Sequence, residues 1–296
     1  MVNTHKSGFV NVIGAPNVGK STLMNQLVGE KLSIITPKAQ TTRHRILGIV
    51  NDDNYQIIYS DTPGLVDPAY KLHQTMMSFA LSALEDADVL LVMVEMGEKK
   101  FKDPHVQEKI MKMDIPVIIL VNKVDTGNQE TLENQVEFWA EQFPGKPILP
   151  ISALEGFNID VIQKKVVELL PEAPPFYPKD GSYTDKTERF LASEIVREAI
   201  LNNYDKEIPY ASEVVVEEFK EEPHIIRIRG DIFVERNTQK GILIGHRGSA
   251  LKRTGTEARK KMEHVFDKKV YLELHVKVDK NWRNDERNLR KYGYMS

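Results

Sequence analysis

The stretch Gly14-Ala15-Pro16-Asn17-Val18-Gly19-Lys20-Ser21 predicts a phosphate-binding loop. An apolar run at residues 9–13 precedes it and an amphipathic run at residues 20–28 follows it, so a strand, a glycine-rich turn and a helix are expected in that order. The glycines let backbone N–H groups curl around phosphates, Lys20 neutralises the β- and γ-phosphates, and the Ser21 hydroxyl ligates Mg²⁺. By itself this loop fits an ATPase as well as a GTPase.

Outward from the loop, the first 170 residues alternate short apolar runs with longer amphipathic stretches, which is typical of an α/β domain with a mostly parallel sheet. Turn-forming residues 51–54 join the second and third strands into a hairpin, so one strand is expected to be antiparallel. We predict six strands, at residues 9–13, 45–50, 55–59, 88–94, 117–121 and 148–151, and five helices, at residues 20–28, 72–84, 104–113, 130–142 and 159–170.

Composition is that of a folded protein of two domains. The 296 residues are 41% hydrophobic and 28% charged, and there is no cysteine, which excludes disulfides, iron–sulfur clusters and cysteine nucleophiles. The longest apolar run, at residues 89–94, is far below the roughly 20 residues that a membrane span needs. The N-terminus lacks a signal-peptide core, and we expect a cytoplasmic protein.

Residues 171–181 contain four prolines and one glycine, a composition that ends a helix and marks a domain boundary. We predict an α/β nucleotide-binding domain at residues 1–172, a linker at 173–186 and a second domain at 187–296. The second domain is expected to contain helices at residues 187–203, 238–244 and 249–266, strands at 212–220, 224–234 and 270–278, and a final charged helix at 282–291.

Two further elements are expected to complete a magnesium and γ-phosphate site. Asp61-Thr62-Pro63-Gly64 follows the third strand, where the aspartate can reach Mg²⁺ through water and the Gly64 N–H can meet the γ-phosphate. A polar loop at residues 35–45 contains two threonines, one of which could bind Mg²⁺ only when a γ-phosphate is present. We favour Thr42, with Thr41 close behind; the alternative is a solvent loop with no role.

Asn122-Lys123-Val124-Asp125 follows an apolar strand, which places it at the carboxyl edge of the sheet. The Asp125 carboxylate can accept hydrogen bonds from N1–H and the 2-amino group of guanine, and adenine offers no such pair. This element favours GTP over ATP. Ser152 and Ala153, after the last strand, would complete base recognition through a backbone N–H.

The C-terminal 61 residues form a basic block, with 16 Lys and Arg against seven Asp and Glu, which suggests a polyanionic partner; the alternatives are a solvated helix face or salt bridges. Within it, Gly245-His246-Arg247-Gly248 lies between a short and a longer predicted helix, as in a type II K-homology (KH) domain. The predicted RNA-binding residues are Ile242, Ile244, Gly245, His246, Arg247, Gly248, Lys252 and Arg253. Ile242 and Ile244 would form the apolar surface on which bases lie.

These motifs together resemble the TRAFAC-class small GTPases, and residues 14–21 with Gln40-Thr41-Thr42-Arg43-His44-Arg45 resemble the Era family closely. In Ras-like proteins a glutamine orients the attacking water where this chain has Leu65, so hydrolysis is expected to be slow and assisted. The resemblance implies that Asn17 helps to hold a catalytic K⁺. The expected catalytic residues are Lys20, Asn17, Thr42 and Gly64; residues 14–21, 41–42, 61–65, 122–125 and 152–153 are expected to bind GTP, and Ser21, Thr42 and Asp61 the metal.

The Era resemblance covers essentially the whole chain. It implies a GTP/GDP switch that binds single-stranded RNA near the 3′ end of 16S rRNA and assists assembly of the 30S subunit, with peripheral membrane contact in the family and no DNA partner. Two alternatives stay open. One is an RNA chaperone whose nucleotide is mainly structural, and the other is a membrane-associated signalling GTPase.

Overall fold

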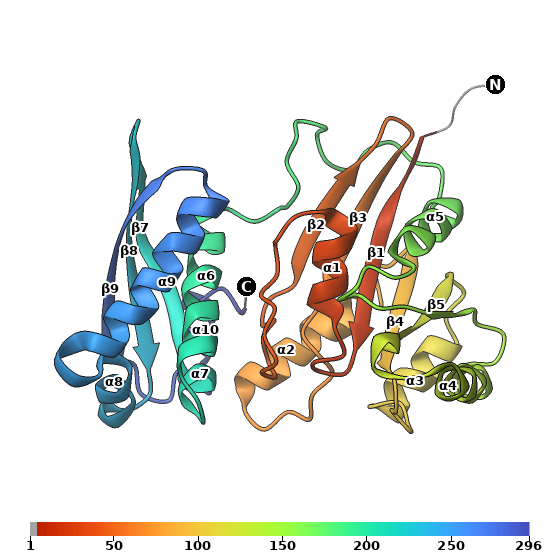
Figure 1. Ribbon diagram of the computed structural model, residues 1–296, viewed down its shortest axis with the longest axis horizontal. Helices are drawn as coiled ribbons and strands as arrows, with labels where there is room; N and C mark the ends of the chain where they lie inside the picture. Colours follow the sequence, from red (N-terminus) through yellow and green to blue (C-terminus); the bar gives the residue numbers. More distant parts are fainter. Residues whose placement is uncertain (1–4, 296) are drawn as a thin grey trace. The chain divides into compact units, whose positions relative to one another are not determined.

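The computed structural model describes residues 5–295, which form two compact units (Figure 1). The first unit contains most of the chain up to Asp185. The second contains Lys186 onward together with two short segments of the N-terminal half, Ile34–Thr41 and Pro68–Thr75. Each unit has its own sheet and core.

A six-stranded sheet organises the first unit. Its strand order is β2-β3-β1-β4-β5-β6; β2 and β3 pair antiparallel, and all other neighbours pair parallel. The predicted α/β class and the antiparallel hairpin are therefore confirmed. The strands are β1 (Lys6–Gly14), β2 (Ile46–Asn51), β3 (Tyr55–Asp61), β4 (Val89–Glu95), β5 (Val117–Asn122) and β6 (Ile148–Pro150).

Five α-helices accompany this sheet, as predicted: α1 (Lys20–Val28), α2 (Lys71–Ser82), α3 (Pro104–Met111), α4 (Gln129–Gln142) and α5 (Ile159–Leu169). Alternate residues of β4 and β5 face a buried cluster that includes Ile110 of α3 and Trp139 of α4. Helices α1 and α5 contact each other. Because β1, β3, β5 and β6 run parallel, the loops after them open at one edge of the sheet, and the nucleotide motifs lie there.

The proline-rich stretch packs against the edge of the same sheet. Gln56 Oε1 accepts hydrogen bonds from the backbone N–H groups of Phe176 and Tyr177, at 2.7 and 2.9 Å. Farther along, Ile49 N–H donates to the Tyr183 carbonyl at 2.9 Å. Residues 173–185, predicted to form a linker, are thus held by the first unit.

The second unit has the type II KH arrangement. Its sheet has the order β7-β8-β9, antiparallel between β7 and β8 and parallel between β8 and β9. Apolar residues of α6 and α9 pack with the inner face of this sheet in one core, which includes Ile200, Ile228 and Met262. The elements are α6 (Glu188–Asn203), α7 (Ile208–Ala211), β7 (Glu213–Glu221), β8 (Ile225–Val234), α8 (Asn237–Ile244), α9 (Ser249–Val265), β9 (Lys269–Val278) and α10 (Glu286–Lys291).

The C-terminal tail corrects one expectation. The predicted charged helix at residues 282–291 begins only at Glu286, where Asp285 caps α10 by accepting hydrogen bonds from the N–H groups of Arg287 and Asn288. Trp282 is fully buried and donates from Nε1 to the Ala211 carbonyl at 3.0 Å. The tail is anchored by buried aromatic residues and is not merely a charged, solvated helix. None of the helices formed by residues 5–295 is long and apolar enough to cross a membrane.

Candidate nucleotide and RNA sites

The phosphate loop connects the end of β1 to the first turn of α1. A Cβ added at Gly14 would lie 2.3 Å from the Met93 carbonyl oxygen, so only glycine fits against the neighbouring strand β4. The side-chain amide of Asn122 donates to the Val18 carbonyl at 2.7 Å and ties the loop to the end of β5. The loop is therefore held in place from two strands, and α1 begins directly behind it at Lys20.

Lys20 is buried and lies across the phosphate loop. Its Nζ donates to the carbonyls of Gly14 and Ala15, at 3.1 and 2.7 Å. Burial lowers the pKa of the Lys20 ammonium to about 8, and the charge of Asp61 opposes that shift. A phosphate at this position would stabilise the charged ammonium, as the sequence motif predicts for Lys20.

Three predicted metal-binding oxygens converge beside Lys20. Ser21 Oγ lies 2.8 Å from both Asp61 Oδ2 and Thr42 Oγ1, and Thr42 Oγ1 donates to Asp61 Oδ2 at 3.2 Å. Asp61 Oδ1 is buried without a hydrogen-bond partner in the described part of the chain, and burial raises the pKa of Asp61 against the opposing effects of Ser21 and Lys20. Hydroxyl and carboxylate oxygens are the ligands that Mg²⁺ prefers, so the residues fit the expected metal.

The structure separates the two threonine candidates. Thr42 belongs to the first unit and to the oxygen cluster, whereas Thr41 belongs to the second unit, where its hydroxyl donates to the Lys38 carbonyl at 2.7 Å. The Thr41 carbonyl accepts a hydrogen bond from the buried guanidinium of Arg197. This geometry favours Thr42 as the metal ligand.

The loop after β3 lies against the phosphate loop. A Cβ on Gly64 would approach the Pro16 backbone to 2.8 Å, and the Leu65 N–H donates to the Gly14 carbonyl at 3.1 Å. The Leu65 side chain is 2% exposed and packs into the core. Thr62 donates its hydroxyl to the Val12 carbonyl at 2.7 Å, which fixes the loop to β1.

The base-recognition elements are bonded to each other. Ser152 Oγ donates to Asp125 Oδ1 at 2.6 Å, which orients the carboxylate. The Ala153 N–H donates to Asn122 Oδ1 at 2.9 Å, so it supports the asparagine. The Lys123 ammonium forms an ion pair with Glu95. The sequence predicted these residues but not the Ser152–Asp125 hydrogen bond, because it depends on how the loop after β6 folds.

The Gly-x-x-Gly loop lies between α8 and α9. Gly245 has φ 71° and ψ −180°, a conformation that is essentially restricted to glycine, and a Cβ there would lie 2.6 Å from the Ala250 Cβ. His246 and Arg247 are exposed, as expected of side chains that meet phosphates. The loop therefore has the close backbone approach that KH domains offer to a nucleic-acid strand.

A groove of about 380 Å³ runs from this loop between α9 and β9. Its aliphatic lining consists of Leu251, Leu272 and Leu274, and its basic lining includes Lys252 and Arg259. Sequence reasoning missed the three leucines, although the alternation in β9 was a signal for Leu272 and Leu274. Gly255, in the middle of α9, widens the groove because a Cβ there would contact Leu274 at 3.5 Å.

Not every predicted RNA contact lies in the groove. Neither Ile242 nor Ile244 lines it, and Ile242 is 51% exposed beside the loop. Arg253 instead donates to the Asn203 carbonyl at 3.4 Å. On helix α9, Lys261 forms an ion pair with Glu198, so the charge of this lysine is neutralised.

Comparison with known proteins identifies the family. A family model described as a 50S ribosome-binding GTPase matches residues 9–123, and a KH domain model matches residues 207–283. The chain is 42% identical to the GTPase Era of Alkaliphilus metalliredigens over 98% of this chain and 99% of that protein. It belongs to the GTPase Era family. The GTPase Era of Ectopseudomonas mendocina is 45% identical, over 98% of this chain and 97% of that protein.

Solved Era structures agree with this assignment. A crystal structure of Era in complex with MgGDPNP and nucleotides 1506–1542 of 16S ribosomal RNA has a TM-score of 0.94 and 40% identity, and covers 99% of this chain and 100% of that one. An Aquifex aeolicus Era variant bound to GDP and AlF₄⁻ has a TM-score of 0.92 and 39% identity, over 98% and 100% of the two chains. The predicted Era resemblance is confirmed, and the chain is a GTPase.

Proposed function

We propose that this Era-family GTPase binds single-stranded RNA from the 3′ end of 16S rRNA and assists assembly of the 30S subunit under control of its nucleotide. The observation that carries the proposal is the groove between α9 and β9 behind the Gly-x-x-Gly loop, with aliphatic and basic residues in one lining. A KH groove holds about four unstacked bases on such a surface. The related Era crystallised with nucleotides 1506–1542 of 16S ribosomal RNA supports the choice of RNA.

The chemistry of the first unit is positioning and charge stabilisation. Lys20 would neutralise the β- and γ-phosphates, and Ser21, Thr42 and Asp61 would hold Mg²⁺, which neutralises charge that develops on the phosphates. The Gly64 N–H would meet the γ-phosphate. Position 65 supplies no side chain that could orient the attacking water, because Leu65 is apolar and packs in the core. We therefore expect intrinsic GTP turnover to be slow. We expect RNA or the ribosome to accelerate it.

Asn17 lies in the phosphate loop with φ 63°, and we propose that it helps to hold K⁺ beside the phosphates, where other GTPases place an arginine. Turnover is then expected to be faster in K⁺ than in Na⁺, and Asn17→Ala is expected to abolish the difference. Single-turnover hydrolysis in matched chloride salts measures this. Equal rates in both salts would refute the K⁺ assignment and leave the GTPase assignment intact.

RNA recognition is tested by fluorescence anisotropy with the full chain in the presence of GDPNP. The 3′-terminal 16S sequence is expected to bind at least about tenfold more tightly than a shuffled RNA and than DNA of the same sequence, since base edges and the 2′-hydroxyl carry specificity. Equal affinities for the native and shuffled RNAs would contradict the proposed target.

A cytoplasmic location follows from such a target. Peripheral membrane contact rests on the family resemblance alone, and sedimentation of the protein with anionic vesicles tests this contact.

A further inference from the structure

A buried arginine of α6 holds the loop that precedes Thr42. Arg197 is 2% exposed, and its guanidinium pairs with Glu194, one turn earlier on the same helix, through Nε at 2.8 Å and Nη2 at 2.7 Å. The same Nη2 donates to the Thr41 carbonyl. Arg197 and Thr41 both belong to the second unit. The guanidinium therefore joins α6 to the loop backbone one residue before the expected metal ligand.

Packing alone does not explain why an arginine occupies this position. Among residues 5–295, Arg197 Nη1 is buried without a hydrogen-bond partner, and a buried donor that is left unsatisfied lowers stability. A buried ion pair can often be replaced by apolar residues of similar volume without loss of stability. An apolar side chain cannot, however, supply the hydrogen bond to the Thr41 carbonyl. That bond is the feature that requires the arginine.

The bond to the Thr41 carbonyl restricts the backbone of the next residue. This carbonyl and the Thr42 N–H lie in one rigid peptide plane, so fixing the carbonyl limits the directions in which the Thr42 side chain can leave the chain. The Thr42 hydroxyl lies 2.8 Å from Ser21 Oγ and donates to Asp61 Oδ2 at 3.2 Å. A ligand on a backbone that is already fixed loses less conformational entropy when it binds a metal.

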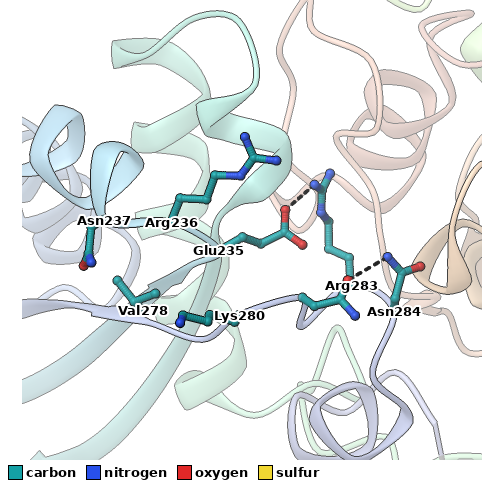
Figure 2. A pocket seen from close by; sticks show the side chains of 8 residues that line it. Glu235, Arg236, Asn237, Val278, Lys280, Arg283 and Asn284 are labelled. Carbon is teal, nitrogen blue, oxygen red and sulfur yellow. Dashed lines mark hydrogen bonds and ion pairs between the residues drawn. The ribbon is translucent and has the colours of Figure 1, made fainter.

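A second contact holds the residue before Thr41. Gln40 has φ 58°, a left-handed conformation that residues with side chains adopt only where the surroundings enforce it. Its Oε1 accepts a hydrogen bond from the Tyr70 hydroxyl at 3.3 Å, and the Arg283 guanidinium lies over the Tyr70 ring, 4.7 Å from its centroid. Figure 2 shows that Arg283 is in turn held by an ion pair with Glu235. The turn before Thr42 is thus strained and held by its surroundings.

Of these anchors, Arg197 acts most directly on the backbone beside Thr42. Lys38 also anchors the loop, through an ion pair with Asp205 at 2.9 Å, but it lies four residues before Thr42 and acts through its own flexible side chain. Tyr70 holds a side-chain oxygen of Gln40 and not the backbone. Hydrogen bonds from a charged donor are also about twice as strong as those from a neutral one.

We propose that Arg197, oriented by Glu194, is a positioning residue for GTP hydrolysis. It fixes the backbone at Thr41 so that the Thr42 hydroxyl is ready to bind Mg²⁺ when GTP is present. In this role Arg197 contacts neither the nucleotide nor the metal. The inference rests on the proposed metal role of Thr42. Because Thr42 would contact the metal only in the presence of a γ-phosphate, loss of Arg197 is expected to affect GTP and not GDP.

The test uses the full chain and the double variant Glu194→Gln/Arg197→Met, which removes the bond to the Thr41 carbonyl without leaving a buried charge unpaired. Single-turnover GTP hydrolysis is expected to be about five- to tenfold slower at limiting Mg²⁺, because one charge-assisted hydrogen bond is lost. The affinity for GDPNP with Mg²⁺ is expected to fall by a similar factor. The affinity for GDP should change less than about twofold, because the Thr42 hydroxyl does not contribute to GDP binding.

A double-mutant cycle shows whether Arg197 acts through Thr42. In a Thr42→Ala background, Glu194→Gln/Arg197→Met should slow hydrolysis by less than about a further twofold, because the ligand that Arg197 positions is absent. A general structural effect would instead slow hydrolysis by the same factor in both backgrounds. Arg197→Lys keeps a charge beside Glu194 but lacks the planar fork that reaches both partners, so a smaller effect with the same pattern is expected. This variant provides the readout if the double variant does not fold.

The matched control is Asp231→Asn/Lys277→Met, which removes the ion pair of another buried carboxylate in the second unit, between β8 and β9. It is expected to leave hydrolysis and its Mg²⁺ dependence unchanged, and urea unfolding compares the stability of all variants.

The positioning role is overturned if the Arg197 variants hydrolyse GTP like the unmodified protein, lose as much affinity for GDP as for GDPNP, slow hydrolysis no more than the control, or act independently of Thr42 in the cycle. If Thr42→Ala itself hydrolyses GTP at the normal rate, the proposed metal role of Thr42 fails, and this inference fails with it.

Discussion

We propose that Asp125 determines base selectivity. Its Oδ1 accepts a hydrogen bond from the Ser152 hydroxyl at 2.6 Å, which orients the carboxylate. A carboxylate in this position pairs with the N1–H and 2-amino donors of guanine, whereas adenine presents no such donor pair and would leave the carboxylate unsatisfied. Discrimination of this kind is large because unpaired polar groups are costly to bury.

Replacing Asp125 with asparagine is expected to lower GTP affinity at least about a hundredfold, because an amide N–H₂ replaces an acceptor opposite two donors. Xanthosine triphosphate, which carries a carbonyl in place of the 2-amino group, should bind the variant better than GTP does. Calorimetric titration with both nucleotides measures this. Asp160→Asn, an exposed carboxylate of α5, is the control and should change nothing. An unchanged GTP affinity in Asp125→Asn would refute the role.

The two neighbouring threonines provide a second residue-scale prediction. Thr42→Ala is expected to slow GTP hydrolysis at least about tenfold and to raise the Mg²⁺ concentration needed for half-maximal rate, because one of three clustered ligand oxygens is lost. Thr41→Ala removes a hydroxyl that bonds to Lys38 and should change the rate less than threefold. A larger effect from Thr41→Ala than from Thr42→Ala would contradict the assignment.

Residue types at the nucleotide site could be predicted from the sequence, but their partners could not. The sequence predicted that Lys20, Asp61 and Asp125 lie at one edge of the sheet, because each follows a strand and the carboxyl ends of parallel strands meet at that edge. The choice between Thr41 and Thr42, and the bond from Ser152 to Asp125, depend on loop conformations that periodicity does not determine. The same holds for the Leu65 side chain, whose apolar nature was evident but whose direction was not.

At the scale of elements, the conformation of the Gly-x-x-Gly loop depends on which of its positions are glycine. Gly245 has a backbone conformation that other residues avoid, whereas Gly241, four residues earlier in α8, has open space around its Cα and a helical conformation. One glycine is thus required by the loop, and the other merely weakens the helix.

Gly245→Ala is expected to destabilise the protein by about 1–3 kcal/mol and to weaken RNA binding at least about tenfold, since the loop must move to relieve the contact with Ala250. Gly241→Ala should stabilise it by up to about 1 kcal/mol through helix propensity and leave RNA binding unchanged. Urea unfolding and RNA anisotropy measure the two effects. Equal behaviour of the two variants would contradict the role given to the loop.

Elements with strong local signals were predictable, and those defined by tertiary contacts were not. Helix α1 begins and ends where its pattern predicts, because glycines flank it on both sides. Helix α7 was missed, since four residues give no periodic signal. The predicted start of the final charged helix at residue 282 was wrong, because Trp282 is buried and its indole donates to the Ala211 carbonyl.

For the whole molecule, we propose that nucleotide binding and RNA binding are coupled. The second unit contains not only the KH elements but also Ile34–Thr41 and Pro68–Thr75, which are continuous in sequence with Thr42 and with the loop after Asp61. Within that unit Lys38 pairs with Asp205 at 2.9 Å, and Lys71 pairs with Glu286 at 2.9 Å. Segments that neighbour the proposed magnesium ligands in the chain thus belong to the same unit as the KH elements.

We propose that these segments let the nucleotide state affect RNA binding, and any such coupling must be reciprocal. If GTP raises RNA affinity by some factor, RNA raises GTP affinity by the same factor. An RNA chaperone with a structural nucleotide, the main rival, has no such coupling.

The most direct measurement is RNA affinity of the full chain with GDP and with GDPNP, using the 3′-terminal 16S sequence. The switch predicts binding at least about fivefold tighter with GDPNP, and an equal rise in GDPNP affinity when that RNA is present. Equal RNA affinities in the two nucleotide states would contradict it.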